Sequence, residues 1–212
     1  IRIESDKLKV SKIEKSLTNV SGILIPGGFG QRGTEGKIAS IKFARKNKIP
    51  FFGICFGMQM AIIEFARNKL KIKNANSTEL VKKCYPVIGL LSEWSKNGKI
   101  IKGTSKNLGG TMRLGLYEAK LRHNSKVQKI YKSNTIFERH RHRYEVNGIM
   151  KDKFEKKGMI FSGLSPDEKL PEIIELKNHP WFIGVQFHPE FRSRPLSPHP
   201  LFSSFIKAAK NF

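Results

Sequence analysis

The chain has 212 residues, of which 39% are hydrophobic and 27% charged, a composition that fits one globular domain with a continuous core. No apolar run is long enough to cross a bilayer, so we expect no membrane association. The formal net charge is +23, but the lysines are scattered without a dense block or an aromatic-rich signature, which favours a solvated basic surface over nucleic-acid binding and leaves binding of nucleotides or acidic metabolites open.

Strands and helices alternate through the first third of the sequence. Residues 21–25 are a short apolar run that stops at a Pro-Gly-Gly turn, which is typical of a buried strand. Apolar residues recur at helical spacing over 34–46, a second buried strand is predicted at 49–54, and a mostly apolar helix at 58–66. This order predicts parallel pairing in an α/β layered fold.

Strands predominate in the rest of the chain. We predict them at 111–121, 138–147, 158–164, 173–176 and 181–187. A closing helix is predicted at 201–209, and surface loops at 68–78 and 92–108. Residues 1–3 also alternate as a strand does, but no start signal precedes them, so we expect the chain to be a fragment of a longer polypeptide.

Cys55 lies in Gly53-Ile54-Cys55-Phe56-Gly57, where a buried strand turns abruptly into a helix. Small residues on both sides permit the strained turn known as a nucleophile elbow. The helix N-terminus there is expected to lower the thiol pKa. A lone cysteine in an apolar segment is usually a small buried hydrophobe, so the flanking glycines make catalysis and packing about equally plausible.

His188 and Glu190 in Gln186-Phe187-His188-Pro189-Glu190 decide between these interpretations. A residue before proline is held extended, and residues two apart in extended chain face the same side. Glu190 can therefore orient the imidazole, as in a catalytic triad. His188 alone would more often be a core histidine, but together with an elbow cysteine it favours catalysis.

The cysteines, Cys55 and Cys84, form no CxxC pair and no metal-ligand spacing. They predict neither a disulfide framework nor a metal site. A reducing, cytoplasmic setting is the expectation that follows.

The GICFGMQ and FHPE stretches together resemble the class I glutamine amidotransferases. Residues 109–115 (GGTMRLG), 139–147 (RHRHRYEVN) and 178–182 (NHPWF) narrow the resemblance to glutaminase domains of the CTP synthase family, from residue 1 to residue 212. It implies a mostly parallel central sheet flanked by helices, with an antiparallel extension. It also implies that the first strand and helix of the domain, and the whole synthetase domain, lie outside this chain.

The resemblance assigns roles to individual residues. Cys55 would attack the glutamine side chain to give a γ-glutamyl thioester, with His188 and Glu190 completing the triad. The oxyanion would be held by main-chain N–H groups of Gly28 and Phe56, at a position where the family usually has Leu or Tyr and this chain has Phe. The remaining contacts to substrate would come from the stretch Phe56, Gly57, Met58 and Gln59, from Glu79 at the α-amino group, and from Arg143 at the α-carboxylate. Arg139 and Arg141 can equally belong to a solvated basic strand.

The resemblance also implies the substrates, cofactors, regulator and oligomeric state of the whole enzyme, most of which involve regions outside this chain. L-Glutamine would be the substrate here, with no cofactor in this domain. ATP and Mg²⁺ would act in the synthetase domain to aminate UTP, GTP would stimulate the glutaminase step, and the active form would be a homotetramer.

Other functions stay open beside this one. Residues 28–33 satisfy GxGxxG after a strand, but the acidic residue expected about twenty positions on falls in Phe51-Phe52-Gly53, so dinucleotide binding is weakly indicated. A GMP synthase glutaminase shares GICxGMQ and FHPE, although RHRHRYEVN and NHPWF disfavour it. A non-catalytic regulatory module would have no need for all three triad residues.

Overall fold

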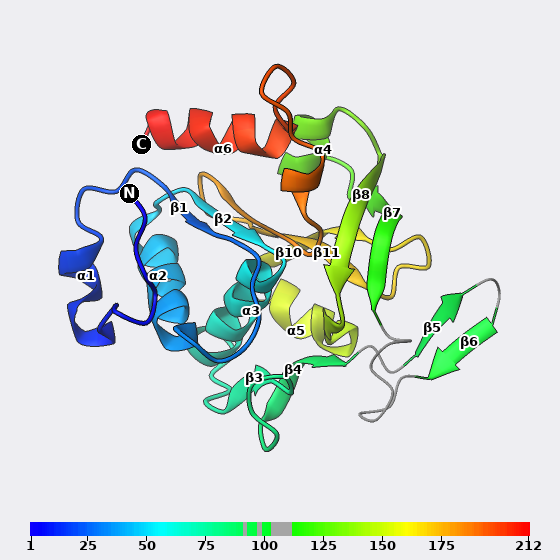
Figure 1. Ribbon diagram of the computed structural model, residues 1–212, viewed down its shortest axis with the longest axis horizontal. Helices are drawn as coiled ribbons and strands as arrows, with labels where there is room; N and C mark the ends of the chain where they lie inside the picture. The colour runs from blue at the N-terminus through cyan, green and yellow to red at the C-terminus, as the bar shows by residue number, and fades with distance from the viewer. Residues whose placement is uncertain (91–92, 97–98, 103–111) are drawn as a thin grey trace.

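The computed structural model describes residues 1–90, 93–96, 99–102 and 112–212. Its central sheet has seven strands in the order β1-β2-β12-β11-β10-β7-β8. Their bounds are β1 Ile23–Ile25, β2 Phe51–Ile54, β12 Phe182–Val185, β11 Pro171–Leu176, β10 Met159–Leu164, β7 Arg113–Leu121 and β8 Thr135–His142. Helices lie on both sides of this sheet (Figure 1): α2 Thr34–Asn47, α3 Phe56–Asn68, α4 Lys126–Tyr131, α5 Lys151–Glu155 and α6 Pro200–Lys210, with the short α1 Ile13–Ser16 near the N-terminus.

The predicted fold class is confirmed. β1, β2 and β12 pair in parallel, and β11, β10, β7 and β8 extend the sheet with antiparallel neighbours. The predicted helices at 34–46, 58–66 and 201–209 are present as α2, α3 and α6. No helix in the described part of the chain combines the length and apolar character needed to span a membrane.

The core lies on both faces of the sheet because successive strand residues point to opposite sides. Phe51 and Phe182 pack beneath α3, with ring centroids 4.5 Å apart. Phe52 and Ile183, the next residues along the same strands, pack with Phe205 of α6 on the opposite face. Both central strands are therefore buried on both faces, as their unbroken apolar runs indicate.

A smaller three-stranded sheet lies beside the central one, with order β3-β4-β9. Its strands are β3 Ala75–Ser77, β4 Tyr85–Leu90 and β9 Tyr144–Val146. The strand predicted at 138–147 is thus two strands in two sheets, separated at Arg143. The break leaves Arg143 where the two sheets meet.

The structure differs from the predicted loops at 68–78 and 92–108 and from the predicted strand at 1–3, and it contains elements that were not predicted. The loop predicted at 68–78 contains β3, whose Ala75 and Ser77 are buried. The loop predicted at 92–108 contains the hairpin β5 Glu93–Lys96 and β6 Lys99–Lys102, and its other residues lie outside the described ranges. The alternation at residues 1–3 forms no strand. β4 was missed because Pro86 and Gly89 are types depleted in strands, and α4 and α5 because each is shorter than two turns.

Candidate active site

Cys55 occupies a strained turn between β2 and α3, as its flanking glycines predict. Its φ of 49° and ψ of −102° place a non-glycine residue in a disfavoured backbone region. A Cβ added at Gly57 would lie 2.2 Å from the carbonyl oxygen of Ile25, and one at Gly53 would lie 2.8 Å from the carbonyl carbon of Gly57. Both positions therefore require glycine because the backbones of β1, β2 and α3 approach one another closely there, and not only because the turn needs a flexible residue.

Burial controls the chemistry of the Cys55 thiol, and the expected lowering of its pKa is wrong. The side chain is 3% exposed, and burial raises the pKa to about 12, with the carboxylates of Glu145, Glu190 and Glu79 adding to the effect. A hydrogen bond with the backbone of Phe56 opposes this shift but does not outweigh it. The resting group is a neutral thiol, so it needs a base to become a nucleophile.

His188 and Glu190 are paired as expected for a base and its orienting carboxylate. His188 Nδ1 lies 2.6 Å from Glu190 Oε1, and within the described residues the buried His188 Nε2 has no hydrogen-bond partner. A Cβ added at Gly27 would lie 2.8 Å from His188 Cε1 and 3.8 Å from Cys55 Cβ. The imidazole and the cysteine thus flank the same point, with the second ring nitrogen free to take a proton.

A cavity of about 210 Å³ adjoins Cys55 and gathers most of the predicted substrate contacts. It is lined by Gly28, Phe29, Cys55, Gln59, Glu79, Met112, His142, Arg143 and Tyr144. Gly28 faces Phe56, because a Cβ added there would lie 3.9 Å from Phe56 Cδ1. The turn after β1 and the start of α3 are therefore adjacent, as two main-chain oxyanion donors would need to be.

Not every residue of the predicted pocket wall presents its side chain to this cavity. Met58 is wholly buried in the hydrophobic core beneath α3, where it lies close to Gly184. Gly57 packs against β1. Gln59 is the member of the stretch whose side chain lines the cavity, and its Nε2 donates to the carbonyl oxygen of Tyr144 at 3.0 Å.

Glu79 and Arg143 face the cavity with opposite charge. Glu79 Oε1 accepts a hydrogen bond from the backbone N–H of Gly30 at 3.2 Å, and burial raises the pKa of the Glu79 carboxyl. The buried Nη1 of Arg143 has no hydrogen-bond partner among the described residues. A buried guanidinium nitrogen without a partner is costly, so this atom is available to an acceptor that enters the cavity.

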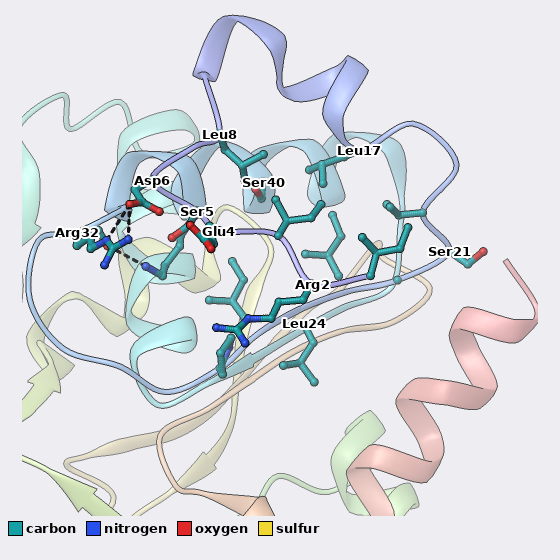
Figure 2. Close-up of a pocket in the computed structure, with 18 of the residues that line it drawn as sticks. Arg2, Glu4, Ser5, Asp6, Leu8, Leu17, Ser21, Leu24, Arg32 and Ser40 are labelled. Atoms are coloured by element: carbon teal, nitrogen blue, oxygen red, sulfur yellow. Dashed lines mark hydrogen bonds and ion pairs between the residues drawn. The ribbon is translucent and has the colours of Figure 1, made fainter.

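A larger cavity, of about 810 Å³, lies between the N-terminal segment and β1. Figure 2 shows Arg2 and Leu24 there, and Asp6 paired with Arg32 at 2.7 Å. Its lining includes neither cysteine and no histidine. Size alone does not make it the active site, because the candidate nucleophile Cys55 lines the smaller cavity.

A buried group of ionisable side chains beside the smaller cavity was not predicted from the sequence. Arg113, His140, His142, Glu145 and Glu172 are each less than 5% exposed. The alternation in RHRHR was the available signal, because it places His140 and His142 on the face opposite the exposed Arg139 and Arg141. Nothing in the local sequence indicated that Arg113 and Glu172 would join them.

Comparison with known proteins gives the family. A sequence model described as Glutamine amidotransferase class-I matches residues 1–208. The chain belongs to this family. The resemblance carried by GICFGMQ and FHPE is thereby confirmed.

The curated relatives of this amidotransferase chain include CTP synthases. It is 77% identical over 211 residues to the CTP synthase of Pelagibacter ubique, covering 100% of this chain and 39% of that protein. The CTP synthase of Sphingopyxis alaskensis is 60% identical over 195 residues, with coverage of 92% and 36%. The chain therefore spans about two-fifths of the length of these relatives.

Solved structures agree with this placement. The glutaminase domain of Trypanosoma brucei CTPS with bound acivicin matches with a TM-score of 0.88 and 36% identity, over 100% of this chain and 80% of that one. A protein from Thermoplasma acidophilum that is described as a GMP synthase component shares the fold, with a TM-score of 0.59 at 15% identity and coverage of 98% and 79%. The narrower resemblance to CTP synthase glutaminase domains is confirmed.

Proposed function

We propose that this chain hydrolyses L-glutamine to glutamate and ammonia, with Cys55 as nucleophile, His188 as base and Glu190 as its orienting partner. The observation that carries the proposal is a single cavity that joins the elbow cysteine to Glu79 and to a guanidinium lacking an acceptor. An α-amino acid supplies a cation for the carboxylate and a carboxylate for Arg143. The planar guanidinium suits that carboxylate through two parallel hydrogen bonds.

The neutral thiol sets the order of the first half-reaction. His188 Nε2 takes the Cys55 proton as sulfur attacks the amide carbon, so the thiolate never has to persist in a buried site. The tetrahedral oxyanion lies between the N–H groups of Gly28 and Phe56, each worth about 3 kcal/mol of barrier in comparable sites. The C–N bond then breaks, His188 returns the proton to nitrogen, and ammonia departs.

Hydrolysis of the γ-glutamyl thioester completes the cycle. A water molecule gives a proton to His188 Nε2 while its oxygen attacks the thioester carbon. The C–S bond breaks, the proton passes to the sulfur, and glutamate leaves. His188 acts first as a base and then as an acid in each half-reaction. Its hydrogen bond with Glu190 keeps Nε2 directed at the reacting atoms.

The ammonia is proposed to serve CTP synthesis. The identity to CTP synthases supports this, since the match covers the whole chain. In such a protein the remaining length would bind ATP, Mg²⁺ and UTP, GTP would stimulate glutamine hydrolysis, and four copies would assemble. A GMP synthase glutaminase is less well supported, because that likeness extends to the fold alone.

Covalent labelling tests the glutaminase proposal directly. Acivicin, the compound bound in the Trypanosoma brucei domain, should modify Cys55 stoichiometrically in the wild type, as read by peptide mass spectrometry. Cys84, the other free cysteine, supplies the control. Cys84→Ala should label and release glutamate from glutamine as the wild type does, and Cys55→Ala should do neither. Labelling that depends on Cys84 would refute the assignment.

A second measurement separates chemistry from folding. When the chain is part of the longer protein, Cys55→Ala should abolish glutamine-dependent CTP formation and leave ammonia-dependent formation intact. Loss of both activities would indicate misfolding instead of a missing nucleophile.

A further inference from the structure

A group of five ionisable side chains lies buried beside the glutamine pocket. Arg113 Nη1 is 3.1 Å from Glu145 Oε1 and 2.7 Å from Glu172 Oε1, so one guanidinium serves two carboxylates. His140 and His142 complete the group from β8. If both carboxylates were ionised, the group would hold one uncompensated negative charge in a medium that strongly disfavours it.

The hydrogen bonds determine where each histidine carries its proton. His142 Nδ1 lies 3.2 Å from the carbonyl oxygen of Tyr144, which only accepts, so Nδ1 is the protonated nitrogen. Neutral His142 then accepts at Nε2, 2.9 Å from His140 Nδ1, which donates. Both rings are neutral because burial, with Arg113 nearby, holds each pKa well below its usual value.

With the protons assigned in this way, two facing atoms, His140 Nε2 and Glu172 Oε2, have no proton between them. Neutral His140 has a bare Nε2, and this nitrogen lies 3.7 Å from Glu172 Oε2. Neither atom has a hydrogen-bond partner within the described part of the chain. Two buried lone pairs would repel each other across that gap. A proton on Glu172 removes the conflict and leaves Arg113 paired with one charged carboxylate.

We propose that Glu172 is held as a carboxylic acid facing His140 Nε2, and that this contact, continued through the two hydrogen-bonded histidines, positions Tyr144 in the glutamine pocket. Glu172 is thus a positioning residue and not a catalytic one, and the inference rests on the proposed glutaminase function. The chain of hydrogen bonds ends at the carbonyl oxygen of Tyr144. That oxygen also accepts from Gln59 Nε2, and both residues line the cavity next to Arg143.

The main chain provides a second connection to the reacting groups. The carbonyl oxygen of Glu172 accepts the N–H of Gln186 at 2.8 Å. Gln186 Nε2 in turn donates to Cys55 Sγ at 3.7 Å. Displacement of Glu172 would therefore affect both sides of the pocket, through Tyr144 on one side and through Gln186 and Cys55 on the other.

The surroundings agree with a retained proton. Burial raises the pKa of Glu172 to about 8, against the opposing effect of Arg113, and Glu145 and Asp167 raise it further. The ionisable groups around it are Arg113 on β7, His140 and His142 on β8, Glu145 on β9, Asp167 in the turn before β11, and His188 beyond His140. Because the folded pKa exceeds the usual 4.5, the stabilisation is complete below pH 4.5 and is lost as pH rises through 8.

Glu172→Gln is the decisive variant because glutamine imitates the protonated acid. Its amide can donate to His140 and accept from Arg113, and it cannot ionise. In the wild type, KM for glutamine should rise severalfold between pH 6.5 and pH 8.5, a range in which glutamine keeps most of its ammonium charge, with a smaller change in kcat. In Glu172→Gln, KM should stay within about twofold of its neutral-pH value over the same range.

A matched control comes from a second buried glutamate that contacts a histidine. Glu138 Oε1 lies 2.9 Å from His199 Nε2, away from the glutamine cavity. Glu138→Gln should keep the wild-type dependence of KM on pH. Thermal unfolding supplies a readout that needs no activity: the Tm of Glu172→Gln relative to wild type should increase between pH 5 and pH 8.5.

Two results would overturn the proposal. One is a KM profile for Glu172→Gln that parallels the wild type, and the other is a KM raised at every pH, which would show that the carboxylate is required. If that variant fails to fold, infrared spectroscopy of the wild type decides, since a carboxylic-acid carbonyl band must be present at pH 7 and weaken as pH rises through the raised pKa of Glu172. Failure of the glutaminase proposal would be seen separately, as a wild type that acivicin does not label.

Discussion

The thiol of Cys55 shows how much the state of a residue depends on its burial. The sequence places it at a helix N-terminus, where the positive end of the dipole favours a thiolate. The fold encloses the sulfur almost completely, and the loss of hydration raises the thiol pKa despite the hydrogen bond with the Phe56 backbone. In the proposed mechanism the proton must therefore pass to His188 during the attack, which makes the position of that ring critical.

Arg143 offers a direct test of substrate recognition. Arg143→Ala would leave the α-carboxylate of glutamine without its partner, and we expect a loss on the order of 2–4 kcal/mol in kcat/KM. Arg141→Ala is the matched control, because Arg141 is two positions away on β8 and exposed. It should leave kcat/KM unchanged. An equal effect of both substitutions would show that the basic strand acts through its charge alone.

Site residues could be predicted where their partners are close in sequence. His188 and Glu190 are two positions apart and do pair, although Glu190 lies in the short 3-10 helix Pro189–Phe191 and not in the extended chain that the prediction assumed. Arg113 and Glu172 are far apart along the chain and meet only because β7 and β11 converge on one buried region, which no local pattern encodes. The role of Arg143 came from family resemblance, and its residue type alone would not have separated it from Arg141.

At the scale of elements, long periodic segments were predictable and short ones were not. α2, α3 and α6 each show a helical repeat, and β2 and β12 are unbroken apolar runs. The split between β8 and β9 was missed because alternation continues through Arg143 while the strand changes sheet. A change of hydrogen-bonding partner leaves no mark on the pattern of side chains.

The contact between β1 and α3 can be tested at Gly57. Gly57→Ala would bring a Cβ to 2.2 Å from the Ile25 carbonyl oxygen, so the helix or the strand must move. We expect a destabilisation of about 1–3 kcal/mol and a decrease of roughly 3–10 °C in Tm, measured by thermal unfolding. Gly89→Ala is the control, since a Cβ there meets no atom within 4 Å. A stable Gly57→Ala variant would mean that the close approach is dispensable.

The charge of the whole molecule is large and of one sign. Forty basic residues against 17 acidic ones give repulsion that the folded state concentrates and the unfolded chain relieves. The basic residues are distributed along the chain, which is why their sum did not indicate a nucleic-acid site. Their collective effect should instead be visible as a dependence of stability on ionic strength.

Raising NaCl from 10 mM to 150 mM should increase Tm by a few degrees. The Debye length falls from about 30 Å to about 8 Å over this range, which screens repulsion between distant lysines. KCl should give the same curve, and a much larger effect of sulfate at equal ionic strength would indicate a specific anion site. A Tm that falls or stays constant in NaCl would contradict this account.

The candidate active site is built from two sheets, and this has a consequence for its motion. Cys55 and His188 follow β2 and β12, two interior strands of the seven-stranded sheet, and the Cys55 N–H donates to the carbonyl oxygen of Val185 at 2.7 Å. Glu79 follows β3 and Tyr144 begins β9, the two edge strands of the three-stranded sheet. Amide hydrogens of the first group should exchange with solvent only on global unfolding, whereas those of the second should exchange through local opening. The part of the site around Glu79 and Tyr144 would then open locally while Cys55 and His188 stay in place, so that substrate could enter without displacing the residues proposed to react.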